Sequence, residues 1–155
     1  MTVNAEQAIR DYLPGVRHLS LGTRDESGAP WVSELDFVFR DDLTVCVRSL
    51  VTRRHSQNMA RDPRVSGTIV RQHQFGGSSV EGVSFAGNAA LLGAGAEQDE
   101  FAGLFVERLG AKPDIVQRAD EGGPQFYRID VGAWYIYGAL DGGRPQTYTV
   151  PGATL

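Results

Sequence analysis

Residues 43–70 read LTVCVRSLVTRRHSQNMARDPRVSGTIV, and this stretch predicts a strand, a short helix and a second strand in succession. Over residues 43–48, aliphatic side chains alternate with other residue types, as expected for a strand whose two faces meet different surroundings. One face would carry Leu43, Val45 and Val47. Thr52 is the predicted N-cap of the helix. The helix is expected to end at Asp62-Pro63, because the residue before a proline is disfavoured in the α region.

Basic side chains gather at the start of this predicted helix. Arg53, Arg54 and His55 occupy its first turn, and Arg48 lies at the end of the preceding strand. A helix N-terminus is the positive end of the macrodipole, so each exposed cation there is expected to cost about 0.3–1 kcal/mol. A bound phosphate would explain the cluster, because free N–H groups and arginine side chains both suit that anion. The alternative is a solvated basic turn answered by the carboxylates of 41–42 or by another acid.

The composition limits the class of protein. The 155 residues, with 41% hydrophobic and 22% charged side chains, predict a single globular domain over 1–155 that needs no disulfide or metal. A net charge of −4 argues against nucleic-acid binding, which requires a basic surplus. Neither a signal-peptide pattern nor a membrane-length apolar run is present, so a cytoplasmic protein without membrane contact is expected.

Reactive side chains are few. Cys46 is the only cysteine, which excludes an intrachain disulfide, and a small buried filler is its expected role. His18 and His73 lack metal-ligand spacing, so no metal site is predicted. No side chain stands out as a catalytic acid, base or nucleophile, and the catalytic residues stay unassigned.

Alternation and turn residues define the remaining elements. Residues 1–15 are expected to hold an N-terminal helix over 4–13, a longer helix is expected over 96–109, and 111–124 should be irregular with one helical turn after Pro113. Residues 141–155 are expected to form a tail. Strands are predicted over 16–24, 30–40, 43–48, 65–72, 80–93 and 125–139. Six strands that carry apolar residues on both faces and bend at glycines predict a mainly β fold, a six-stranded antiparallel split β-barrel with flanking helices.

Four motifs in this order resemble a known family. They are RS at 48–49, RRHSQNMARDPRVS at 53–66, SFAGNAALL at 84–92 and FYRIDVGAWYIY at 126–137. Together they resemble the FMN-binding split-barrel family typified by pyridoxamine 5′-phosphate oxidase. The resemblance implies a homodimer with FMN in the cleft between two protomers.

The resemblance also implies roles for single residues. Arg48 and Ser49 match a strand end near the FMN phosphate, and Arg54 and His55 match the basic pair that grips it. The strand that meets the flavin ring and ribityl chain is matched by residues 33–38, of which Ser33, Glu34 and Leu35 are the expected contacts. Tyr137 matches an aromatic that reaches the flavin from the partner chain, and Trp134 is its near neighbour. Such aromatics more often belong to a core or a dimer interface than stack on a cofactor.

This chain departs from the oxidase itself. Ser33 and Val38 replace phosphate-facing basic residues, and His55 replaces a lysine. The oxidase's C-terminal arginine-containing segment has no counterpart after Tyr137. Pyridoxamine phosphate oxidation is therefore not expected.

Three functions stay open at this stage. The first is an FMN-dependent oxidoreductase acting on a small molecule. The second is a binding protein that holds flavin, haem or a deazaflavin without turnover. The third is a structural dimer without a cofactor.

Overall fold

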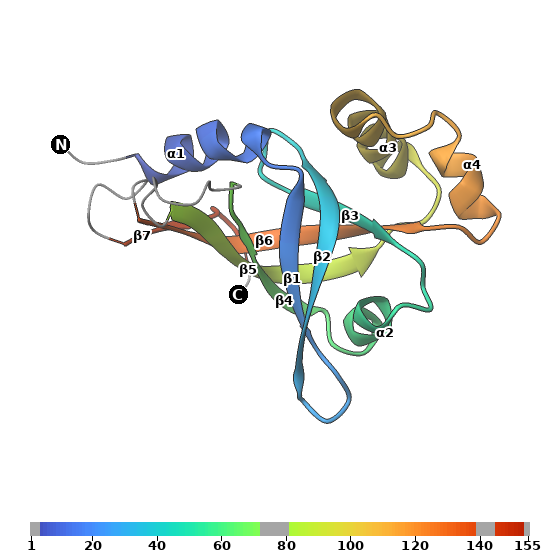
Figure 1. Cartoon of the computed structure of the whole chain (residues 1–155), viewed down its shortest axis with the longest axis horizontal. Coiled ribbons are helices and arrows are strands. Elements are labelled where there is room, and N and C mark those ends of the chain that lie inside the picture. Colours follow the sequence, from blue (N-terminus) through green and yellow to red (C-terminus); the bar gives the residue numbers. More distant parts are fainter. Residues whose placement is uncertain (1–3, 72–80, 139–144, 154–155) are drawn as a thin grey trace, which may run out of the picture.

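The computed structural model describes residues 4–71, 81–138 and 145–153 (Figure 1). The strand ends predicted at 72, 80 and 139 and parts of the predicted tail lie outside these residues. The elements in chain order are α1 (Ala5–Tyr12), η1 (Leu13–Gly15), β1 (His18–Arg24), β2 (Pro30–Phe39), β3 (Val45–Ser49), α2 (Arg54–Arg61), β4 (Arg64–Ile69), β5 (Glu81–Leu91), α3 (Ala96–Leu109), α4 (Ile115–Asp120), β6 (Gln125–Gly138) and β7 (Gln146–Thr149).

The strands form a closed antiparallel barrel with one additional strand. They follow the order β3-β2-β1-β4-β5-β6-β7, and pairing of β3 with β6 closes the first six into a barrel. Closure removes the free sheet edges that an open six-stranded sheet would expose. The predicted six-stranded antiparallel barrel with flanking helices is confirmed.

Strand β6 holds the barrel together along its whole length. One of its edges pairs with β5, and the register shifts between Ala86 and Gly87, where a Cβ would collide with the Asp130 carbonyl. Gly87 thus permits the close approach expected of a glycine in this strand. The other edge of β6 pairs first with β3 and then with β7.

The prediction for the C-terminal tail is therefore wrong in its central part. Residues 146–149 form β7, which pairs with Ala133–Ile136 of the same chain. The physical reason is that β6 runs beyond the reach of the five-residue β3 and leaves backbone groups that need partners.

Two apolar cores lie on the two sides of the barrel wall. The larger fills the barrel, with Val45 and Val47 of β3 facing it, and the smaller lies between the barrel and the pair α3 and α4 (Figure 1). Cys46 is buried in the smaller core, and burial raises the pKa of its thiol. The cysteine is a buried filler, as the sequence predicted.

The stretch 43–70 forms the predicted strand, helix and strand, with shifted boundaries. Leu43 is buried but lies in the turn before β3 with φ 65° rather than in the strand. The N-cap of α2 is Arg53 instead of Thr52, and no side chain caps the helix. The helix ends at Asp62, as predicted from Pro63.

The other helices also match the sequence pattern. Helix α3 has the predicted bounds and ends at Gly110, whose φ of 67° is the left-handed C-cap conformation. In the predicted irregular segment 111–124, the expected turn is the six-residue helix α4. Helix α1 begins at the Asn4 cap, whose side chain accepts a hydrogen bond from the Gln7 backbone N–H at 3.1 Å.

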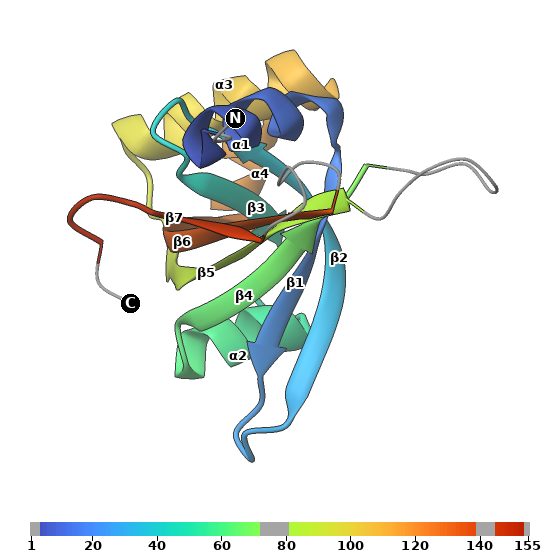
Figure 2. The same cartoon turned by 90° about the vertical axis from the view of Figure 1, so that its left-hand side faces the viewer.

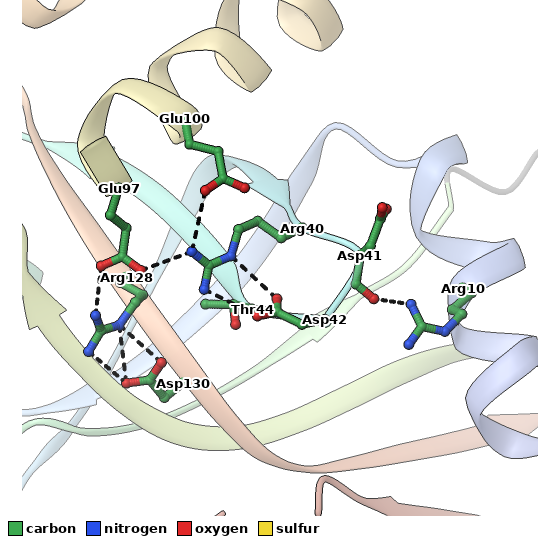
Figure 3. A network of polar contacts seen from close by, with 9 residues as sticks. All are labelled: Arg10, Arg40, Asp41, Asp42, Thr44, Glu97, Glu100, Arg128 and Asp130. Atoms are coloured by element: carbon green, nitrogen blue, oxygen red, sulfur yellow. Dashed lines mark hydrogen bonds and ion pairs between the residues drawn. The ribbon is translucent and has the colours of Figure 1, made fainter. Parts of the chain in front are cut away.

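A network of charges fixes the start of α3 to the barrel (Figure 3). Glu97 accepts a hydrogen bond at 2.9 Å from Arg40, which directly follows β2, and one at 2.7 Å from Arg128 of β6. Arg128 also binds Asp130, and the Arg40 guanidinium lies 4.9 Å from the Phe101 ring centre. One carboxylate thus joins three elements that are distant in sequence.

Replacing this carboxylate should destabilise the fold. Partial burial alone would raise the pKa of Glu97, but the hydrogen bonds and charges of Arg128 and Arg40 hold it below its ordinary value. A depressed pKa means that the carboxylate stabilises the fold above its unfolded pKa and loses that effect as the pH falls through the folded pKa. We expect Glu97→Gln to lower the free energy of unfolding by about 1–2 kcal/mol near neutral pH. The difference from wild type should shrink in acid.

Urea unfolding at several pH values tests this expectation. Glu100→Gln is the matched control, because Glu100 lies 3.7 Å from Arg40 and its side chain is 56% exposed, against 33% for Glu97. The control should stay within about 0.5 kcal/mol of wild type. Equal effects of the two variants would contradict a special role for Glu97.

Candidate functional site

A split in the barrel wall creates the candidate site. Strands β2 and β3 pair only over Phe37–Phe39 and Val45–Val47. The part of β2 that precedes Phe37 pairs only with β1, whereas Arg48 and Ser49 of β3 pair with β6. The two strands therefore part, and the β2 edge over 33–36 has no ladder partner on its β3 side. Backbone donors and acceptors along that edge are free to meet a ligand.

Helix α2 lies at the mouth of the barrel beside this split (Figures 1 and 2). Met59 packs into the barrel core, and the Asn58 side chain donates a hydrogen bond to Thr23 Oγ1 of β1 at 3.0 Å. These contacts orient the helix so that its N-terminus points at the gap between β2 and β3. With no side-chain cap, the N–H groups of its first turn are available to an anion.

A surface cleft of about 570 Å³ occupies the split. Its lining comes from β2, from the end of β3, from the start of α2 and from the segment before β6. The lining residues are Trp31, Ser33, Glu34, Leu35, Arg48, Ser49, Leu50, Arg53, Arg54, His55 and Pro124. A second cleft of about 760 Å³ continues from it along β2 and shares Glu34, Leu35, Arg48 and Pro124.

The first cleft carries an excess of positive charge. Arg53 has no ion pair within the described part of the chain, and Arg54 makes one contact with Asp25 at 3.3 Å. Such an exposed pair contributes at most about 1 kcal/mol. The Arg54 guanidinium also lies 4.1 Å from the Trp31 ring centre. Glu34 is the one carboxylate of the lining, and it accepts a hydrogen bond from Ser20 Oγ.

Arg48 is held by aromatic rings instead of by an acid. Its guanidinium lies 5.6 Å from the Phe105 ring centre and 5.3 Å from that of Phe126. Its Nε is buried without a hydrogen-bond partner in the described structure, and burial lowers the pKa of the side chain. Arg48 forms no ion pair within the described residues, although the charge of Asp36 acts on it in the favourable direction. A partly buried cation of this kind suits an anion in the cleft.

His55 is almost fully buried between the two separated strands. Its Nδ1 lies 3.0 Å from Ser33 Oγ of β2, and its Nε2 lies 2.6 Å from Ser49 Oγ of β3. Burial and then the charge of Arg53 lower the pKa of His55. The imidazole is therefore neutral at pH 7 in the free protein, unlike the cation that the sequence comparison placed here.

The sequence matches the model of the family described as pyridoxamine 5′-phosphate oxidase over residues 5–138. The chain belongs to this family. No curated protein sequence matches the chain significantly.

Solved structures share the split-barrel fold of the family. A haem-binding protein from Mycobacterium smegmatis is 21% identical with a TM-score of 0.73, and the match covers 96% of this chain but 59% of that one. The haem storage protein HutZ from Vibrio cholerae is 18% identical with a TM-score of 0.68, covering 96% and 95%. A conserved hypothetical protein from Mycobacterium tuberculosis is 19% identical with a TM-score of 0.69, covering 97% and 88%. At these identities the likeness shows the fold.

Most of the predicted site residues meet in the family's split-barrel cleft. Two strands and α2 bring together Ser33, Glu34, Leu35, Arg48, Ser49, Arg54 and His55. The two aromatics lie elsewhere in the chain. Trp134 is 0% exposed inside the barrel against Phe85, which matches the core role that its pattern also allowed. Tyr137 lies over Gly82 at the opposite end of β6, roughly 35 Å of strand away from the cleft.

Several residues that line the cleft were not predicted from the sequence. Trp31 lies under the Arg54 guanidinium through a tertiary contact that no sequence spacing shows. Leu50 and Pro124 line the cleft because β3 and β6 are paired, although they are far apart in sequence. Arg53 was part of the basic cluster and proves to be the N-cap.

Metal-ligating clusters and membrane-length apolar helices are two features that the described residues do not contain. In the described ranges no group of three or more His, Cys, Asp or Glu side chains is arranged to hold a metal ion. No helix within those ranges is both long and apolar enough to cross a membrane.

Replacing Arg48 should separate its packing role from its charge. Met in its place keeps an extended apolar contact with the two phenylalanine rings and removes an unpaired, partly buried cation. We expect Arg48→Met to leave the free energy of unfolding within about 1 kcal/mol of wild type, or to raise it. Urea unfolding measures this. A loss above about 2 kcal/mol would show that the cation itself stabilises the fold.

Proposed function

We propose that this protein binds FMN in the cleft between β2 and β3, as a homodimer, and acts as an oxidoreductase on a small molecule. The observation that supports the proposal is the uncapped N-terminus of α2 beside an unpaired strand edge, where Arg48 and Arg53 form no ion pair within the described residues and Arg54 forms one, with Asp25. This combination suits a molecule with a phosphate at one end and hydrogen-bonding groups along its length. FMN has both.

The residues divide into two groups toward such a ligand. The phosphate would be held by Arg53 and Arg54, by the first-turn N–H groups of α2 and by the hydroxyl of Ser49. The backbone edge of β2 over 33–36 would meet the polar groups of the rest of the molecule. The flavin supplies the redox chemistry when it is bound, while the protein orients it and sets the local charge.

Haem is the second ligand to consider, because two structural neighbours are named as a haem-binding and a haem storage protein. Haem iron needs an axial ligand such as a histidine nitrogen. In the described part of the chain both nitrogens of His55 face serine hydroxyls, and His18 Nε2 lies 2.8 Å from Asp36. Neither of these histidines thus presents an unengaged nitrogen to a haem iron, and on this ground we rank a phosphorylated flavin, or a deazaflavin nucleotide, above haem.

A homodimer is supported by an uncovered outer face of the barrel. Because Leu21, Val65 and Phe85 point inward, the outer face of β1, β4 and β5 carries their alternating neighbours. These are the small residues Ser20, Gly22, Ser66, Thr68, Ser84 and Ala86. In Figure 2 the helices lie at the ends of this face, with α1 and α3 above and α2 below. Exposed apolar side chains adjoin it, among them Val70 and Tyr135.

The face also reaches the cleft. Glu34, which lines the cleft, binds Ser20 on this face, and Tyr137 lies over Gly82 on the same side of the sheet. A second chain packed here would bring its residues to the cleft of the first. Tyr137, which cannot reach the cleft of its own chain, is a candidate for such a contribution.

Removing two cations should abolish tight FMN binding. Each lost charge-assisted hydrogen bond costs about 1.5–3 kcal/mol, so Arg53→Gln combined with Arg54→Gln should weaken FMN binding well over tenfold. Fluorescence titration of apoprotein with FMN measures the affinity. Arg61→Gln is the matched control, because Arg61 is exposed at the far end of the same helix. Unchanged affinity in the double variant would refute the site.

Spectra and turnover separate the three functions. Flavin absorption bands in the purified protein support the proposal, and a Soret band indicates haem. The absence of both indicates a protein without these cofactors. Reduction of the bound flavin by NADH or NADPH, followed by reoxidation with an acceptor, distinguishes an enzyme from a carrier.

A charge placed on the outer face should break the dimer. Ser84→Arg puts a guanidinium where two flat faces would meet, and burying it unpaired costs several kcal/mol. We expect the mass measured by light scattering to fall to that of one chain. Gln117→Arg adds the same charge to the exposed surface of α4 and should leave the mass unchanged. A monomeric wild-type protein would contradict the dimer.

A further inference from the structure

A chain of hydrogen bonds crosses the mouth of the barrel at the cleft. Trp31 Nε1 donates to Ser33 Oγ at 3.1 Å, Ser33 Oγ lies 3.0 Å from His55 Nδ1, and His55 Nε2 lies 2.6 Å from Ser49 Oγ. The two serines belong to β2 and β3, the strands that part here. His55 therefore joins the two edges of the split. With His55 8% exposed and Ser49 7%, water does not substitute freely for these partners.

The neutral imidazole leaves one hydroxyl proton for a ligand. A neutral ring has one N–H donor and one acceptor nitrogen, and the Trp31 indole can only donate. If Nδ1 carries the proton, Ser33 accepts two hydrogen bonds and its own proton is free, while Ser49 must donate to Nε2. In the other tautomer Ser33 donates to the ring, and the Ser49 proton is left to the Leu50 carbonyl oxygen at 3.4 Å or to a ligand. Either way, one serine proton points at the ring.

A protonated imidazole changes this arrangement. Both ring nitrogens then donate, so both Ser33 and Ser49 accept. Both hydroxyl protons turn away from the ring and become donors to whatever occupies the cleft. The ring also adds a positive charge beside Arg53. Protonation of one side chain thus raises the number of free hydroxyl donors from one to two and adds one positive charge on the side that an anion would approach.

We propose that His55 is a positioning residue that takes up a proton when a phosphate group enters the cleft, so that Ser33 and Ser49 both donate to the phosphate. The proposal rests on the proposed function for its ligand, FMN. The charged groups around the ring are the lining arginines Arg48, Arg53 and Arg54. The nearby carboxylates are engaged elsewhere, Glu34 with Ser20 and Asp25 with Arg54. In the free protein these cations oppose a further charge, and a phosphate reverses that balance.

Linkage gives the direction of the pH effect. Burial and Arg53 hold the pKa of His55 below its ordinary value of 6.5 in the free protein. A phosphate that favours the protonated ring raises this pKa, and phosphate affinity then increases as the pH falls from the bound pKa to the free pKa. Above the bound pKa the ring is neutral in both states and the affinity is independent of it.

Imidazole NMR tests the proposal directly. The pKa of His55 is measured on the full chain with and without inorganic phosphate, and the resonance is assigned by its loss in His55→Gln. We expect phosphate to raise the pKa by about one pH unit, which corresponds to a tenfold preference for the protonated ring. An unchanged pKa overturns the proposal, whether or not FMN binds.

FMN affinity supplies the second measurement. His55→Lys keeps a positive charge throughout, so the ratio of wild-type to variant affinity cancels the ionisation of the FMN phosphate itself, whose second pKa is about 6. This ratio should rise severalfold as the pH falls from about 8 to about 6, whereas riboflavin, which has no phosphate, should give a constant ratio. A constant ratio with FMN overturns the role of His55 but leaves the flavin site standing. If phosphate raises the pKa of His55 while FMN does not bind, this inference holds and the proposed function fails.

Discussion

The parting of β2 from β3 after Phe37 is the constraint on which the rest of this structure depends. Strand β3 stays with β6 and closes the barrel, while the earlier part of β2 stays with β1. The barrel wall is therefore continuous where β2 and β3 pair and has a gap where they separate. The gap is lined by unpaired backbone on one side and by the start of α2 on the other. The candidate site is built from the backbone and side chains that border this gap.

Aromatic rings hold two of the three cations of the cleft, and within the described residues only Arg54 also pairs with an acid, Asp25 at 3.3 Å. Two phenylalanine rings enclose Arg48, the ring of Trp31 supports Arg54, and Arg53 projects from the N-cap. Aromatic contacts fix a guanidinium and leave its charge available, whereas a carboxylate partner would satisfy it. The chain as a whole is acidic, with a net charge of −4, so the arginines that line this cleft run against its overall charge.

The sequence predicted what depends on neighbouring residues and missed what depends on pairing between distant strands. Alternation and the proline at 63 placed the strands and the end of α2, and the dipole mismatch pointed to the cleft. The true N-cap, Arg53, was missed because its side chain makes no capping bond. The buried state of His55 was also missed, because its partners Ser33 and Ser49 are brought together only when the barrel closes. Likewise β7 forms because β6 is longer than β3, which no local pattern shows.

Helix α2 serves the barrel interior and the cleft at once. Met59 fills the barrel core and Asn58 binds Thr23, while the first turn of the same helix faces the cleft. A ligand held at that first turn would therefore tighten the closure of the barrel mouth, because a rigid helix transmits the restraint along its length. Binding and folding are thus linked through a single eight-residue helix.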